Sequence, residues 1–95
     1  MTYSIFQLPD EHRNLFMNHR WVTNHGGINF RDYNTVYTGE IEGTDTTEIL
    51  ERIYTIFNTK HPDGYRGRSL SVGDLVALED TGTYFCDSFG FKKVN

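Results

Sequence analysis

The segment that most constrains the fold is the last third of the chain, because it has the pattern of a β-hairpin. An apolar run, Leu75 to Leu78, lies between a turn at Gly73 and Asp74 and a second turn over residues 79–82, and the aromatic-rich segment Thr83 to Phe91 follows. Short strand-like runs bounded by Gly and Asp are typical of paired antiparallel strands. We therefore predict a compact C-terminal hairpin.

Two earlier segments have the two-residue period of β-strands. Residues Tyr3 to Leu8 alternate between two sides, and Pro9 ends the pattern. Tyr33 to Glu42 alternates over a longer stretch that is rich in aromatic and β-branched side chains. Both segments are predicted to be strands, the second with one face exposed to solvent.

The clearest helix pattern runs from Thr46 to Thr59, where apolar residues recur at steps of three and four. Asp45 stands three residues before Glu48, the spacing of a capping box that begins a helix. A shorter helix is expected to begin at Pro9, since acidic residues follow it directly. Thr23 to Asp32 contains two adjacent glycines and is expected to be a surface loop.

The predicted order is β-α-β-α-β-β within a single domain, residues 1–95. Short connections and consecutive terminal strands favour an α+β fold, with a small, mainly antiparallel sheet of about four strands and two helices. The chain is 37% hydrophobic and 15% aromatic, which argues for a folded core rather than disorder.

Composition also narrows the classes of function. No apolar run approaches the ~20 residues of a membrane span, and the single cysteine, Cys86, rules out an internal disulfide. We expect a cytoplasmic protein that does not bind a membrane. The net charge is −4 and the nine Lys and Arg residues are scattered, so direct binding to nucleic acid is not expected. An acidic surface of this kind favours a protein partner with a basic surface.

Cys86 is the candidate nucleophile, and a hydrolase would use it with His61 and Asp87. The favoured interpretation is that Cys86 is a small buried residue of a strand, because no cysteine-enzyme signature surrounds it. Asp74 and Asp87 would together form a carboxylate pair for acid-base chemistry. For Asp74 we favour a turn residue that hydrogen-bonds to its own backbone.

Three histidines, His12, His19 and His25, raise the question of a metal site. Their spacing matches no usual zinc pattern, so surface or capping roles are favoured and no metal or cofactor is expected. The loop from Gly64 to Ser69 has two glycines and two arginines but no Walker pattern. We expect Arg68 to hydrogen-bond to loop carbonyls or to a carboxylate.

Exposed aromatic and charged residues are the remaining candidates for binding. Five aromatic residues lie in or beside predicted loops, and about half of them are expected in the core: Trp21, Phe30, Tyr33, Tyr65 and Phe89. An acidic stretch and an aromatic side chain flanked by arginines are the two predicted contact surfaces. The residues assigned to partner binding are Glu40, Glu42, Asp45, Glu48, Glu51, Tyr65, Arg66 and Arg68. The alternative for the acidic residues is a solvated strand edge and helix face.

The C-terminal block resembles a known family. The motifs that carry the likeness are the run from Gly67 to Leu78 and the run from Tyr84 to Phe91, preceded by Phe57-Asn58 and Pro62-Asp63. They resemble the YodL-like domain over Tyr33 to Val94. The resemblance implies a cytoplasmic bacterial domain common on mobile genetic elements, without established catalytic residues. It also implies a link to the actin-like filament that shapes rod cells, through a founding member.

Three functional hypotheses follow. The first is an inhibitor that binds a host-defence protein, such as a CRISPR effector nuclease or a restriction enzyme, and blocks the nuclease or its guide-RNA loading. The second is a binder of the actin-like filament or of another cytoplasmic bacterial protein. The third is a small hydrolase that depends on Cys86. Of these we favour the inhibitor, which is not an enzyme.

Overall fold

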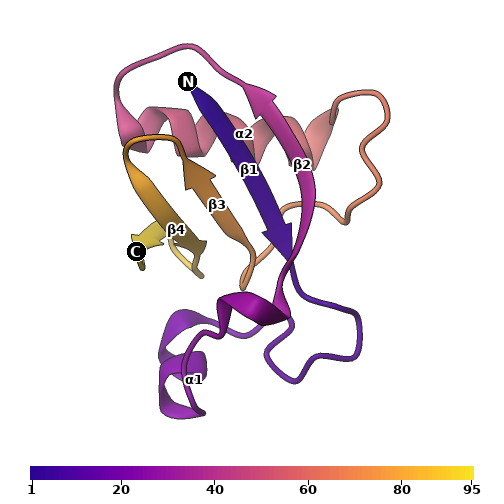
Figure 1. Ribbon diagram of the computed structural model, residues 1–95, viewed down its shortest axis with the longest axis vertical. Coiled ribbons are helices and arrows are strands. Elements are labelled where there is room, and N and C mark those ends of the chain that lie inside the picture. Colours follow the sequence, from indigo (N-terminus) through magenta and orange to yellow (C-terminus); the bar gives the residue numbers. More distant parts are fainter.

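The computed structural model describes residues 1–95 and shows an α+β fold, as the sequence predicts (Figure 1). Five strands, two α-helices and one 3-10 turn follow one another along the chain. Their bounds are β1 (Thr2–Gln7), α1 (His19–Asn24), η1 (Phe30–Asp32), β2 (Asn34–Glu40), α2 (Thr46–Thr59), β3 (Leu75–Leu78), β4 (Gly82–Cys86) and β5 (Phe91–Lys93).

The five strands form one antiparallel sheet in the order β2-β1-β3-β4-β5. The N-terminal strand β1 is interior to this sheet, so Ile5 lies opposite both Tyr37 of β2 and Val76 of β3. Side chains of β1 alternate between buried and partly buried positions, as its two-residue period predicts. The two edges of the sheet are therefore β2 and β5.

Helix α2 covers one face of the sheet and supplies the main core (Figure 1). Its buried residues, Ile49, Leu50, Ile53 and Phe57, recur at the predicted helical spacing. The ring of Phe57 packs edge-on against Tyr65, with centroids 4.8 Å apart. Burying these large side chains is the main source of stability in a domain of this size.

The opposite face carries a smaller cluster under α1, and here the predicted helix boundary is wrong. Residues 9–17 form turns, and the helix begins only at His19, where the side chain of Asn18 accepts a hydrogen bond from Trp21 N at 2.9 Å. A helix starting at Pro9 cannot continue through Phe16, whose φ of 65° is left-handed. Val22 is the residue that α1 buries in this cluster.

The C-terminal hairpin is confirmed, and the aromatic-rich segment after it contains one more turn. β3 pairs with β4 as expected, but the chain reverses over Asp87 to Gly90 and returns as β5. Gly90 adopts a φ of 71°, which glycine adopts without the steric cost that other residues meet, and Asp87 N donates to Gly90 O at 2.9 Å. This turn raises the sheet from about four strands to five.

No helix of this protein is both long enough and apolar enough to cross a membrane.

Candidate functional site

Acidic side chains collect at the end of the sheet where β1 begins. Thr2 pairs with Glu40 on the β2 side, and its carbonyl accepts a hydrogen bond from Glu79 N on the β3 side at 2.9 Å. Glu40 and Glu79 therefore flank one residue of β1 from two directions. Both are exposed, as is Asp80 in the following turn.

The loop from β2 to α2 adds further acidic residues to this end. Glu42 is exposed, and its carbonyl accepts a hydrogen bond from Arg52 Nη1 at 2.6 Å. Asp45 caps α2, as the capping-box spacing predicts, by accepting from Glu48 N at 3.1 Å. We call the combined surface the acidic end. Its members are Glu40, Glu42, Asp45, Glu48, Glu79 and Asp80.

Glu51 is exposed one turn further along α2, where it lines a separate groove. Positive charge near the acidic end is limited to a few groups. The amino terminus lies 4.0 Å from Glu40 Oε1, and Arg52 binds the loop carbonyl described above. The side chain of Lys93 lies against Gly82, in the turn that carries Glu79 and Asp80. The five acidic residues assigned to partner binding are thus all accessible, and the partner that they would bind remains a prediction.

The second predicted contact surface, the loop after α2, differs from expectation at Tyr65. Its ring is only 7% exposed, because it packs against Phe57 and Tyr37 and its hydroxyl donates to Arg68 O. The idea of Tyr65 as an inserting aromatic anchor is therefore wrong. Arg66 is exposed and stays a candidate.

Arg68 has the structural role that its loop predicts. Its guanidinium donates to Asp10 Oδ1 at 2.8 Å and to Leu8 O at 2.9 Å, which ties the loop to the end of β1. Gly67 lies in the same contact between the loop and β1. A Cβ at this position would lie only 2.7 Å from Gln7 Oε1, so a larger residue would not fit without a shift. These contacts occupy Arg68, and its availability to a partner is correspondingly reduced.

Asp74 is a turn residue, as predicted, but its carboxylate is also buried. Oδ2 accepts from Ser71 N at 2.9 Å and from Gln7 Nε2 at 3.0 Å, and the residue is 1% exposed. Burial raises the pKa of Asp74 to about 6, against the lowering effect of these hydrogen bonds and of Arg68. The carboxylate joins β1 to the chain entering β3.

Cys86 is a buried residue of β4, which confirms the favoured interpretation. It is 2% exposed, and burial together with the charges of Asp74 and Asp87 raises the pKa of its thiol to about 12. Asp87 adjoins it and accepts from His19 N at 3.1 Å. The third member of the hydrolase hypothesis, His61, instead packs near Tyr65, with ring centroids 5.2 Å apart.

The three N-terminal histidines have separate environments. His12 Nε2 bonds to Asp32 Oδ2 at 2.8 Å, His19 packs edge-on against Phe85, and His25 stacks on Trp21 at the end of α1. No group of three or more His, Cys, Asp or Glu side chains is arranged to hold a metal ion.

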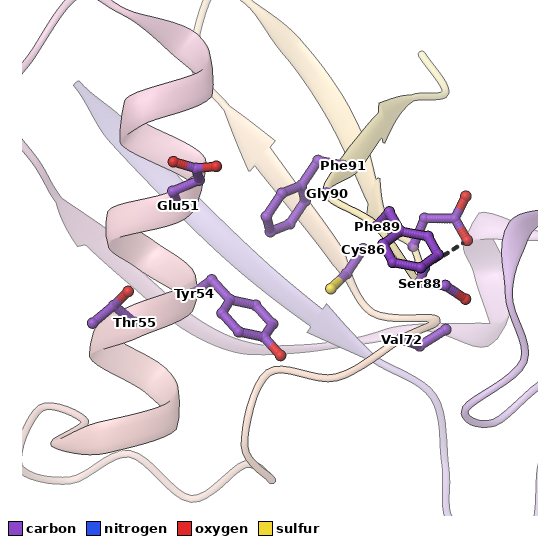
Figure 2. A pocket seen from close by; sticks show the side chains of 10 residues that line it. Glu51, Tyr54, Thr55, Val72, Cys86, Ser88, Phe89, Gly90 and Phe91 are labelled. Carbon is purple, nitrogen blue, oxygen red and sulfur yellow. Dashed lines mark hydrogen bonds between the residues drawn. The ribbon is translucent and has the colours of Figure 1, made fainter.

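A groove between α2 and the β4–β5 turn is the surface feature that sequence reasoning missed (Figure 2). Its volume is about 500 Å³. Tyr54 faces it from the helix, while Cys86 and Phe91 face it from the sheet. Phe89, at the tip of the turn, is 96% exposed. The signal for it was a phenylalanine in a tight Ser-Phe-Gly turn, a position where small polar residues are usual.

Comparison with known proteins identifies the family of this chain. The YodL-like domain matches residues 2–95, nearly the whole chain. The chain belongs to the YodL-like domain family. Within it, the chain is similar to the uncharacterized protein YodL of Bacillus subtilis (strain 168), with 28% identity over 71 residues that cover 68% of each protein. No solved structure matches the chain. The predicted family is therefore confirmed, and the match extends beyond the predicted Tyr33 to Val94 into the N-terminal segment.

Proposed function

We propose that this YodL-like domain is a protein inhibitor that occupies the basic nucleic-acid channel of a bacterial defence nuclease. The observation that supports the proposal is the acidic end, where six exposed carboxylates extend over the β2, β3 and α2 boundaries. Nucleic-acid channels carry a positive potential, and an acidic protein surface competes with phosphates for it.

The physical setting of these carboxylates suits a role in association. They are exposed and lie at a strand end, in turns and at a helix start, so a partner reaches them without opening the core. With the net charge of −4, they favour fast, salt-sensitive encounter with a basic partner. Each exposed charge alone contributes little to the free energy of binding, so the attraction to a basic partner depends on several carboxylates acting together.

The family resemblance supports the choice of target class. Domains like this one are expected on mobile genetic elements, which benefit from blocking CRISPR or restriction nucleases in the cytoplasm of the host. An inhibitor of that kind needs a binding surface and no catalytic centre. The proposal therefore assigns anti-CRISPR or anti-restriction activity to the acidic end.

The test is DNA cleavage by a panel of purified CRISPR effector nucleases and restriction enzymes, with the protein added before guide RNA or DNA. We expect reduced cleavage by at least one nuclease. The double variant Glu42→Gln, Glu79→Gln should inhibit less, since it removes charge from the acidic end. Its matched control, Glu11→Gln with Asp63→Asn, removes the same charge from exposed sites elsewhere and should inhibit as the unchanged protein does. Unchanged cleavage across the panel would exclude the proposal.

A second candidate partner is the actin-like filament that sets the shape of rod cells. The family resemblance favours testing it, because a founding member of the family is linked to that filament. Expression in such a cell should change cell width or curvature if the filament is the partner. Normal morphology at full expression would count against this alternative.

A further inference from the structure

Phe89 is the most exposed of the large apolar residues, and hydrogen bonds hold the turn that carries it. The residue is 96% exposed. Asp87 N donates to Gly90 O, and Asp87 Oδ1 accepts from Ser88 N, each at 2.9 Å. A third bond, from His19 N to Asp87 Oδ1 at 3.1 Å, joins the turn to the start of α1. Because its backbone is already fixed, Phe89 contacts a ligand at a small cost in conformational entropy.

Three aromatic rings line the groove beside this turn. Tyr54, 43% exposed, faces it from α2 and meets Phe91 of β5 edge-on, with ring centroids 6.5 Å apart. Val72 and Cys86 line it as well, and in Figure 2 the Cys86 sulfur lies between those two rings and Phe89. The volume of about 500 Å³ is in the range of sites that bind small ligands. A group that enters the groove therefore meets aromatic surface from both the helix and the turn.

The charged side chains that line the groove are both negative. Glu51 is exposed on α2, and Asp87 belongs to the turn. Lys92 and Lys93 follow on β5, but neither lines the groove. Side chains alternate along a strand, so Lys92 points to the other face of the sheet, and the side chain of Lys93 lies against Gly82. The groove thus combines aromatic rings with negative charge.

Glu51 is the carboxylate that is free to bind a cation. It lies three residues before Tyr54 on α2, so the two side chains share one side of the helix, and it takes part in no ion pair of the protein. Asp87 is less available, because its Oδ1 already accepts two backbone hydrogen bonds. Burial raises the pKa of Asp87, but these bonds and the charges of His19 and Lys92 lower it by more. The groove therefore offers one unpaired carboxylate beside an exposed ring.

We propose that the groove binds an arginine side chain of a partner protein, with the guanidinium against the aromatic rings and paired with Glu51. A guanidinium is always charged and stacks on aromatic faces, where the ring quadrupole attracts it. Its planar set of donors also suits a carboxylate acceptor. This site is separate from the acidic end and does not depend on nuclease inhibition.

Other occupants fit the groove less well. An ammonium group of lysine is more strongly hydrated than a guanidinium, so it loses more when it enters an aromatic site. An apolar side chain would take water away from the Glu51 carboxylate and give it no partner. A phosphate group would be repelled by both carboxylates. Charge and ring chemistry together therefore favour arginine.

The test follows ¹⁵N shift changes while a capped glycine-arginine-glycine peptide is added at constant ionic strength. A copy with citrulline has nearly the same shape but no charge, and a copy with lysine has the same charge but no guanidinium. We expect the arginine peptide to shift residues 51–55 and 86–91, with a dissociation constant on the order of millimolar. Both altered peptides should bind at least about threefold more weakly.

Variants of the rings test the aromatic contribution. Tyr54→Leu and Phe89→Leu each keep an apolar side chain but remove a ring, and both sites are exposed enough for the protein to fold. We expect each to bind the arginine peptide about threefold more weakly, with a smaller change for the citrulline copy. The matched control is Phe30→Leu, which removes an exposed ring outside the groove and should bind as the unchanged protein does.

A variant of the carboxylate tests the ion pair. Glu51→Gln keeps the size of the side chain and removes its charge, so the arginine peptide should bind at least about threefold more weakly. Glu11→Gln removes the same charge from an exposed site outside the groove and should leave the affinity unchanged.

Four results would overturn the proposal. The first is the absence of shift changes at residues 86–91 at saturating arginine peptide. The second is equal binding of the citrulline or the lysine copy, which would remove the preference for a guanidinium. The third is an unchanged affinity in both Tyr54→Leu and Phe89→Leu. The fourth is a dimer in light scattering that Tyr54→Leu abolishes, which would make a second copy of the chain the occupant.

Discussion

At the scale of single residues, two buried titratable groups meet at one end of the β3–β4 pair: Asp74, just before β3, and Cys86, the last residue of β4. Asp74 accepts from Gln7 and Ser71 and so fixes the approach of the chain to β3. Cys86 N donates to Asp74 O, and the pKa of the Cys86 thiol is raised by burial and, to a smaller extent, by the Asp74 carboxylate. Sequence indicated the turn at Asp74 and the burial of Cys86, but the long-range partner Gln7 has no local signature.

The stability of the fold should depend on pH through Asp74. Its folded pKa of about 6 exceeds the unfolded value of 3.8, so its contribution is fully present below pH 3.8 and is lost as the pH rises through about 6. Between about pH 4 and about pH 7 the free energy of unfolding should fall by about 2 kcal/mol more for the unchanged protein than for Asp74→Asn. Urea unfolding across this range measures the difference. Parallel pH profiles for the two proteins would contradict it.

The thiol of Cys86 should be unreactive while the protein is folded. A pKa of about 12 in place of 9.0 lowers the thiolate fraction at neutral pH about a thousandfold, and burial blocks access as well. Ellman's reagent should therefore label the native protein far more slowly than the urea-unfolded chain. Equal rates would show that the thiol is accessible and would revive the hydrolase hypothesis, which Cys86→Ala then tests.

At the scale of elements, the helices and strands that bury a regularly spaced apolar face were the ones that the sequence predicted. β1 and α2 repeat their apolar residues at the spacing that their buried faces require, so the sequence located them closely. β2 was also located closely, although none of its residues is buried. α1 is only six residues long and buries one side chain, Val22, which is too little for a periodic signal. β5 was missed because three residues after the Gly90 turn show no alternation. Tyr65 was misjudged because its burial depends on how the loop after α2 folds back onto Phe57 and onto Tyr37 of β2, which no local pattern indicates.

At the start of α2, the contribution of the Asp45 cap to stability can be separated from that of its negative charge. Asp45→Ala should lower the free energy of unfolding by about 1 kcal/mol, because Glu48 N loses its acceptor. Asp45→Asn keeps the acceptor and removes the charge, so it should remain close to the unchanged protein in stability. Thermal unfolding monitored by circular dichroism measures both. If Asn destabilised as much as Ala, the charge rather than the cap would stabilise the helix.

At the scale of the whole molecule, the fold separates two surfaces. One end of the sheet gathers the carboxylates of the acidic end, while α2 and the β4–β5 turn border a groove with Phe89 at its rim. Four acidic residues of the first surface were predicted from the sequence, because they are close along the chain: Glu40, Glu42, Asp45 and Glu48. Glu79 and Asp80 were not, since only the pairing of β1 with β3 brings them to the same end of the sheet. The groove was not, since its two walls come from segments that only the sheet brings together.

The central claim is that the acidic end takes the place of nucleic acid on a nuclease. Its most direct test is the affinity of a defence nuclease for labelled guide RNA or DNA, measured by anisotropy at increasing concentrations of this protein and at two salt concentrations. We predict that the apparent dissociation constant of the nucleic acid rises with protein concentration, less steeply at higher salt and for Glu42→Gln, Glu79→Gln. An affinity that stays constant at saturating protein, for every nuclease tested, would contradict the claim.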